Sequence, residues 1–323
     1  MPSIQSEIRF LPVAVPDAIR PEDVEDVKSG AYIAQLLEAS GISVQDNDVI
    51  AISSKVAAFL DDGLVRLADV APTRKARILG RVFQRDPRKV QLVLEQGKIF
   101  LVVPMRRIIR IPALRKMMER RTGDPETMVN GYEVNNAFTF IVKKHAVYLD
   151  EAGIDHTNSP EGYVTLLPED PCRLAGEIRE GIRRCFGADV AVILTDTVTS
   201  VGRLGSQDVA IGYCGIDPVT RETFSHDLFG VPRAGGIDLI IDSIAGMAGL
   251  VMGQTIEKTP IVVVRGLSYH PERPDELPGM EAVAWPAGTE WKFALLTILS
   301  TAKLWLGSLL AFQPRTKKSR IRQ

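Results

Sequence analysis

VAVILTDTVTS, residues Val190–Ser200, joins a short apolar run to an aspartate that stands between two threonines. A β-branched apolar run of this length is typical of a buried strand. Asp196 and Thr197 then follow the carboxyl end of that strand, where open α/β sheets bind their ligands. Their oxygen atoms suit a magnesium ion that carries nucleotide phosphates. An equally weighted alternative is that Asp196 only caps a turn, because aspartate and threonine are common turn residues.

Two further stretches have a similar character. AGIDHTNSP, residues 152–160, sets Asp155 and Asn158 among small hydrogen-bonding residues. LVMGQTIEKTPIVVVRG, residues 250–266, predicts a helix end, a turn and a second buried strand. The turn offers exposed backbone and an amide side chain, from Met252, Gly253 and Gln254. Each stretch alone is a weak signal of a binding site.

Elsewhere the apolar periodicity predicts alternating helices and strands. SGAYIAQLLEASGI, residues 29–42, has helical spacing and a glycine stop, and a strand follows in DNDVIAISS. Residues 72–97 predict two amphipathic helices broken near Asp86–Pro87, and KIFLVV then predicts a strand. This order of elements indicates a mixed α/β protein.

Six segments in one order resemble one family, the nucleotide-dependent γ-glutamyl ligases that add glutamate to the deazaflavin coenzyme F420. The segments span most of the chain from about residue 45 to residue 267: LADVAPTRKARILG, AGIDHTN, VTLLPEDPCRLAGEIR, VILTDT, DVAIGYCGIDP and LVMGQ…PIVVVRGL. Six matches in order are far more specific than any single one. The resemblance implies an α/β ligase domain of two lobes over residues 1–268, with the site in the groove between the lobes, and a homodimer.

The resemblance also assigns roles to individual residues. It implies four ligands of Mg²⁺ or Mn²⁺, which are Asp155, Asp196, Thr197 and Gln254. It implies contacts with GTP or ATP, the co-substrate, from Ser54, Lys55, Asn158, Met252, Gly253, Gln254, Thr255 and Thr259. The catalytic residues that it implies are Asp155, Asp196 and Arg203.

Amide formation requires the carboxylate oxygen to become a leaving group. Phosphoryl transfer achieves this by forming an acyl phosphate, and two metal ions would offset the phosphate charge. The attacking amine then loses a proton, which a carboxylate can accept. Asp208 and Asp242 are candidates for this base, although for each a purely structural role is the stronger expectation.

The chain departs from the family where the acceptor would be recognised. The family reads SDTFGRPWR where this chain reads TDTVTSVGR, so Arg203 remains while Ser200 and Gly202 replace recognition residues. Guanidinium groups bind phosphate with paired hydrogen bonds. The loss of the recognition groups at Ser200 and Gly202 predicts a smaller carboxylate acceptor, joined to an amino acid such as L-glutamate. The alternatives are the deazaflavin γ-glutamyl ligase itself and a non-catalytic nucleotide-binding relative. The family's ANAG is DEAG here, with Asp150 and Glu151.

Composition restricts the class of partner. The 323 residues include 39 Lys and Arg against 40 Asp and Glu, and 45% are apolar. These values favour a folded protein that binds small polar molecules and not nucleic acid. Three cysteines without a CxxC spacing, and an amino-terminal segment without a signal core, predict a cytoplasmic protein.

Two segments lie outside the family pattern. Residues 104–136 form a basic insertion, for which a solvated helix face is the main expectation and an anionic ligand or membrane the alternative. Residues 269–323 form a C-terminal extension with an apolar helix at Trp291–Phe312 and a basic tail. Lys292 and Lys303 argue against a bilayer span. We expect the helix to pack on the domain or a second subunit, with weak membrane association as the alternative.

Overall fold

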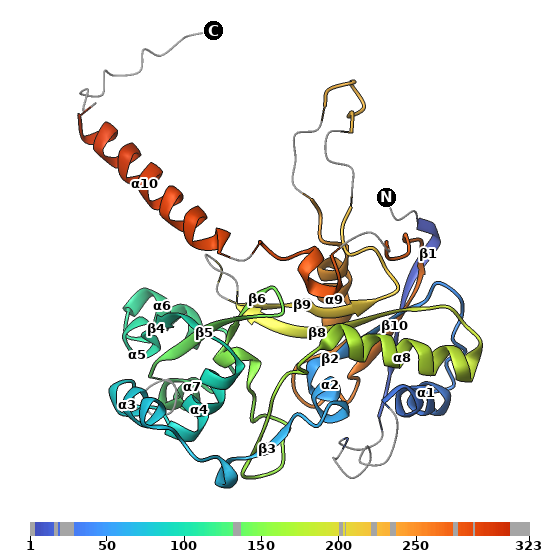
Figure 1. Cartoon of the computed structure of the whole chain (residues 1–323), viewed down its shortest axis with the longest axis horizontal. Coiled ribbons are helices and arrows are strands. Elements are labelled where there is room, and N and C mark those ends of the chain that lie inside the picture. Colours follow the sequence, from blue (N-terminus) through green and yellow to red (C-terminus); the bar gives the residue numbers. More distant parts are fainter. Residues whose placement is uncertain are drawn as a thin grey trace. The chain divides into compact units, whose positions relative to one another are not determined.

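The computed structural model describes residues 4–15, 19, 29–131, 137–199, 203, 205–220, 225–232, 237–273, 277–286 and 288–310. Contacts divide the chain into two compact units, Met1–Val283 and Ala284–Gln323. Helices and strands alternate along the larger unit, which confirms the predicted mixed α/β class (Figure 1). Ser200 and Gly202 fall outside the described residues, as do Phe312 and the basic tail.

A five-stranded sheet with the order β1-β10-β2-β8-β9 is the centre of the larger unit. Its strands are β1 (Ile4–Val13), β2 (Val49–Ser53), β8 (Ala191–Thr199), β9 (Ser206–Cys214) and β10 (Ile261–Leu267). β2 and β8 are parallel, and the other neighbours are antiparallel. β8 contains AVIL of the run VAVIL, and β10 contains IVVVR. Both runs are buried where they cross the core, which confirms both strand predictions.

Alternate residues of the central strands point to opposite faces of the sheet, and each face has its own apolar core. Ile50 and Val192 face one core, which includes side chains of α1 (Ser29–Ala39) and α8 (Pro171–Phe186). Val49 and Ile193 face the other, which α9 (Ile240–Met252) covers. The helices α1 and α8 lie side by side (Figure 1).

The approach of α1 to α8 depends on two glycines. A Cβ atom on Gly181 would lie 2.4 Å from the backbone of Gly30, so neither position has room for a side chain. Small residues at this crossing therefore fix the distance between the two helices.

A second, smaller sheet has a core of its own. It consists of β4 (Ile99–Val103), β5 (Thr139–Lys144) and β6 (Val147–Asp150). The helices α3 (Arg74–Val82) and α4 (Pro87–Gln96) pack on it, as the periodicity of residues 72–97 predicted. A two-stranded antiparallel ribbon consists of β3 (Leu64–Arg66) and β7 (Tyr163–Thr165).

The basic insertion forms three short helices, α5 (Met105–Ile109), α6 (Pro112–Glu119) and α7 (Pro125–Asn130). No residue of α6 is buried, and its Arg115 pairs with Glu119 one turn later. Residues 132–136 lie outside the described part of the insertion. The role of this surface stays a prediction.

The smaller unit contains α10 (Thr289–Leu310), the helix predicted near Trp291–Phe312. Among the helices of the described residues, none combines the length and the apolar character that crossing a bilayer requires.

Candidate functional site

A pocket of about 970 Å³ lies at the carboxyl end of the parallel pair β2 and β8. It is lined mainly by four segments that are far apart in sequence, near residues 53–59, 150–160, 195–208 and 252–260, and also by Val15 and Ile19. Every predicted metal ligand and nucleotide contact lines it, whereas Arg203 does not. Motifs that were identified separately therefore form one site.

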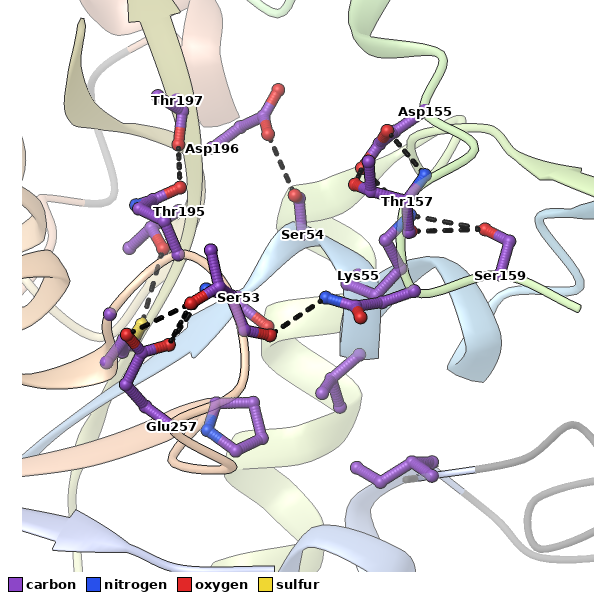
Figure 2. Close-up of a pocket in the computed structure, with 18 of the residues that line it drawn as sticks. Ser53, Ser54, Lys55, Asp155, Thr157, Ser159, Thr195, Asp196, Thr197 and Glu257 are labelled. Carbon is purple, nitrogen blue, oxygen red and sulfur yellow. Dashed lines mark hydrogen bonds and ion pairs between the residues drawn. The ribbon is translucent and has the colours of Figure 1, made fainter. Parts of the chain in front are cut away.

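The register of β2 and β8 explains how two of these motifs meet. The parallel pairing ends at Ser53 and Thr195, after which β2 turns into α2 (Ser54–Leu60). Ser54 and Asp196 are the next residues of each segment, and Ser54 Oγ donates a hydrogen bond of 2.8 Å to Asp196 Oδ1. Figure 2 shows these side chains pointing toward one another.

Lys55 connects α2 to the Asp155 motif. Its Nζ donates to Thr165 Oγ1 at 2.6 Å. The same atom lies 3.1 Å from Asp155 Oδ2 (Figure 2). Thr157 donates to the same carboxylate from its backbone N at 2.9 Å and from its hydroxyl at 2.6 Å. Burial alone would raise the pKa of Asp155, but these hydrogen bonds and the charge of Lys55 outweigh it and lower the pKa. Asp155 is therefore held as a carboxylate.

The pKa of Asp196 is shifted in the opposite direction to that of Asp155. Burial raises the pKa of its carboxyl group to about 6, and the negative charges of Asp155 and Asp208 act in the same direction. Hydrogen bonds from Ser54 and from the backbone of Thr197 oppose the rise without cancelling it. Three carboxylates thus share a pocket with more negative charge than its neighbouring groups neutralise, which is an environment that favours a bound cation.

A second cluster of oxygen atoms forms where β8 pairs with β9. Thr197 is opposite Asp208 in the register, and its hydroxyl donates to Asp208 Oδ1 at 2.7 Å. The amide of Gln254 donates to the same oxygen at 3.3 Å. Asp208 therefore reaches the pocket, whereas Asp242 accepts a hydrogen bond from the backbone N of Ala210 and does not line it.

The segment after α9 closes one side of the pocket. Gly253 has a positive φ of 71°, which glycine adopts without strain and which ends the helix. The Thr259 hydroxyl donates to the carbonyl of Met252 at 3.0 Å. Asn158 Nδ2 donates to the carbonyl of Thr255 at 3.3 Å and so joins this loop to the Asp155 motif.

The donor set fits a hard divalent cation, because carboxylate, hydroxyl and amide oxygens are the ligands that Mg²⁺ and Mn²⁺ prefer. Within the described ranges, no three His, Cys, Asp or Glu side chains converge closely enough to hold an ion by themselves. A bound ion would therefore take mixed ligands, in which phosphate or water oxygens complete the shell. The residues that could contribute are Asp155, Asp196, Thr197, Asp208 and Gln254.

The pocket differs from the predicted set of site residues at a few positions. Arg203 is exposed and does not line the pocket. Sequence reasoning missed Thr165, which holds Lys55, and Glu257, whose carboxylate accepts a hydrogen bond from the Thr255 backbone N at 2.8 Å. Thr165 forms an isolated β-bridge with Asp155. The signal that could have found it is that Thr165 belongs to the segment VTLLPEDPCRLAGEIR, which was already recognised in the sequence.

Comparison with known proteins agrees with this site. A family model described as F420-0:Gamma-glutamyl ligase matches residues 22–266. The coenzyme F420:L-glutamate ligase of Methanopyrus kandleri is 31% identical over 266 residues, which are 82% of this chain and 90% of that protein. Proteins of the same name from Methanosarcina mazei and Haloarcula marismortui are both 28% identical, over 79% and 77% of this chain and 88% and 86% of theirs.

These matches span most of the chain, and the family match includes the lining segments from residue 53 to residue 260. They identify the protein as an amide-bond-forming ligase. The chain belongs to the F420-0:Gamma-glutamyl ligase family.

Proposed function

We propose that this protein joins L-glutamate to the deazaflavin coenzyme F420, in a reaction that consumes GTP or ATP and requires Mg²⁺ or Mn²⁺. The observation that carries the proposal is the convergence of Asp155, Asp196 and Asp208 in one pocket, within a chain whose relatives are named for this ligation. The replaced residues at Ser200 and Gly202 predicted a different acceptor. The relatives favour the deazaflavin coenzyme, so a smaller carboxylate is the alternative to be tested.

The reaction would begin with phosphoryl transfer from the nucleotide to the acceptor carboxylate. One carboxylate oxygen forms a bond to the γ-phosphorus, and the nucleoside diphosphate leaves. When bound, divalent ions would neutralise the phosphate charge that develops during this step. The loop from Met252 to Thr259 and the ammonium group of Lys55 would bind the nucleotide. Ser54 would fix the Asp196 carboxylate toward the site through its hydrogen bond.

The second step would form the amide. The glutamate nitrogen attacks the carbonyl carbon of the acyl phosphate, the bond from carbon to the phosphate oxygen breaks, and phosphate leaves. The nitrogen must also lose a proton. Asp208 would accept it, because the Thr197 hydroxyl and the Gln254 amide orient its carboxylate within the pocket.

Isotope transfer tests this sequence of steps. Oxygen-18 in the acceptor carboxylate should appear in the released phosphate, because an acyl phosphate passes one of its oxygens to phosphorus. The experiment should be run with the deazaflavin precursor and with small carboxylates in parallel, each with GTP and with ATP. Labelled phosphate from the small carboxylates alone would favour the changed acceptor. Release of unlabelled phosphate during ligation would contradict the acyl phosphate.

The homodimer implied by the family resemblance is part of the same proposal. Sedimentation equilibrium of the purified chain should give twice the mass of one chain, and a single-chain mass at all concentrations would contradict it.

A further inference from the structure

The helix α10, within the unit Ala284–Gln323, has one predominantly apolar side. At about 100° per residue, the positions that share this side are Trp291, Ala294, Leu295, Ile298, Leu299, Ala302, Trp305 and Leu306. The opposite side holds the hydroxyl residues Thr289, Thr297, Ser300 and Thr301, interrupted by Phe293, Leu296 and Leu304. The helix is therefore amphipathic, with an apolar side wider than its polar side.

Described side chains on this apolar side are largely exposed. Leu295, Ile298 and Leu306 are 57%, 65% and 60% exposed. One ring contact within the unit joins Trp285 to Phe293, at 4.8 Å between centroids. The described residues at 284–286, 288 and 289–310 are thus too few to bury the helix, and its apolar side requires another partner.

The family relationship shows that this partner is not required to complete the ligase core. The family match ends at residue 266, and the two cores of the five-stranded sheet consist of residues that precede Ala284. α10 is therefore an addition to a fold that already buries its own apolar residues.

Charge distinguishes this unit from the rest of the chain. Residues 284–323 contain seven Lys and Arg and one Glu, whereas the remaining residues contain 32 Lys and Arg and 39 Asp and Glu. On α10, Lys292 and Lys303 are eleven residues apart, about three helical turns, so they lie on the same flank of the apolar side. The other five basic residues follow the helix in sequence, at Arg315, Lys317, Lys318, Arg320 and Arg322.

The tryptophans have the same distribution. The chain has three, and all of them lie in this unit, at Trp285, Trp291 and Trp305. Tryptophan is enriched at the boundary between lipid headgroups and acyl chains, where its ring is buried and its N–H reaches water. Trp291 and Trp305 share the apolar side near its two ends, as a helix lying along that boundary would place them.

We propose that α10 binds in the plane of a membrane that contains anionic lipids, and that it attaches the ligase to the membrane surface. Its apolar side would enter the headgroup boundary while Lys292 and Lys303, on the flank of that side, contact lipid phosphates. Pairing of two copies through this unit is disfavoured, because each copy would bring a strong positive charge to the interface. A transmembrane orientation would place Lys303 within the acyl chains.

Intrinsic fluorescence of the full-length protein provides a specific test, because each tryptophan reports on this unit alone. Vesicles of phosphatidylcholine with phosphatidylglycerol should shift the emission to shorter wavelength and float the protein in a density gradient. Vesicles of phosphatidylcholine alone should bind it several-fold more weakly, and added salt should reduce binding to the mixed vesicles.

Two matched variants separate apolar insertion from general effects of mutation. Ile298→Asn places an amide in the apolar side and should weaken binding by about tenfold or more. Ser300→Asn places the same amide on the polar side and should change binding by less than about twofold. Ligase turnover in solution should be equal in the two variants, since neither residue belongs to the ligase core.

Three outcomes would overturn the proposal. Short-wavelength emission without vesicles, together with a lower unfolding temperature in Ile298→Asn, would show that α10 packs on protein. Resistance of the bound protein to alkaline carbonate would indicate a spanning helix. Equal binding of both variants would remove the apolar side from the interaction.

Discussion

Asp155 and Asp196 are two aspartates in one pocket with opposite shifts of pKa. Asp155 is held by two residues, Thr157 through two hydrogen bonds and Lys55 through its charge, whereas Asp196 is largely buried and close to other carboxylates. Sequence alone identified both residues, because their motifs are local and the chemistry of each is visible in a few letters. The role of Asp208 depends on the pairing of β8 with β9, a long-range feature that its own neighbours in sequence do not reveal.

Replacing Asp196 by asparagine should remove a charged ligand while keeping the size of the side chain. We expect metal-dependent nucleotide affinity to fall by roughly 10- to 100-fold, the effect of losing one charge-assisted contact. Titration calorimetry with and without Mn²⁺ would measure this. Asp242→Asn is the matched control, since Asp242 does not line the pocket. This variant should bind the nucleotide with the affinity of the wild type.

The raised pKa of Asp196 also predicts how the stability of the metal-free protein depends on pH. The folded state holds this proton more tightly than the unfolded state, so the stabilising contribution is complete below the unfolded pKa of 3.8. It is lost as the pH rises through the folded pKa of about 6, with a total effect of at most about 3 kcal/mol. Denaturant unfolding at a series of pH values should show that the free energy of unfolding falls less with rising pH in Asp196→Asn than in the wild type. An identical pH dependence in both proteins would contradict the assignment.

Single elements were easier to predict than their arrangement. The helices α3 and α4 and the strands β8 and β10 follow from local apolar spacing and from Asp86–Pro87. The sheet order β1-β10-β2-β8-β9 brings the first strand beside the last, and no local pattern encodes such long-range pairing. The site exists because this order places β2 beside β8.

The helix α9 positions Asp208 through a close approach. A Cβ atom on Gly249 would lie 1.6 Å from Asp208 Oδ2, so Gly249→Ala must displace this carboxylate. A displacement of about 1 Å can lower kcat/KM by about a hundredfold, which steady-state kinetics would detect. On the same helix, a Cβ on Gly246 would meet its nearest atom at 3.6 Å. Gly246→Ala should therefore keep activity, and equal activity in both variants would show that the position of Asp208 is unimportant.

A buried ion pair fixes the segment that precedes the Asp155 motif. Arg85 lies 2.8 Å from Glu151, and their side chains are 7% and 18% exposed. Burial raises the pKa of Glu151 although the charge of Arg85 opposes the rise. Arg85→Met would leave this carboxyl group without its cation and should lower the free energy of unfolding by about 3–5 kcal/mol.

The control for this pair is Arg88→Met. Arg88 and Asp86 form a more exposed pair, with side chains 43% and 29% exposed, so its loss should cost less than about 1 kcal/mol. Urea unfolding would measure both variants. Equal losses of unfolding free energy in the two variants would contradict a larger effect of the buried Arg85 pair.

At the scale of the whole molecule, the family match covers residues 22–266, which include most of the segments that line the pocket, and the helix α10 follows the match. Acceptor identity was the part of the function that the sequence predicted least well. We expect it to depend on side chains around residues 200–204, where the sequence differs from the family motif and where the structure describes only Arg203.

Mass spectrometry of the ligation product tests the central claim most directly. The purified protein would be incubated with the deazaflavin precursor, L-glutamate, Mn²⁺ and GTP or ATP, and omission of each component would serve as a control. We predict a product heavier than the precursor by one glutamyl residue, formed only in the complete mixture and lost with Asp196→Asn. Absence of this product from the wild-type reaction, while small carboxylates are ligated or while nucleotide binds without turnover, would contradict the account.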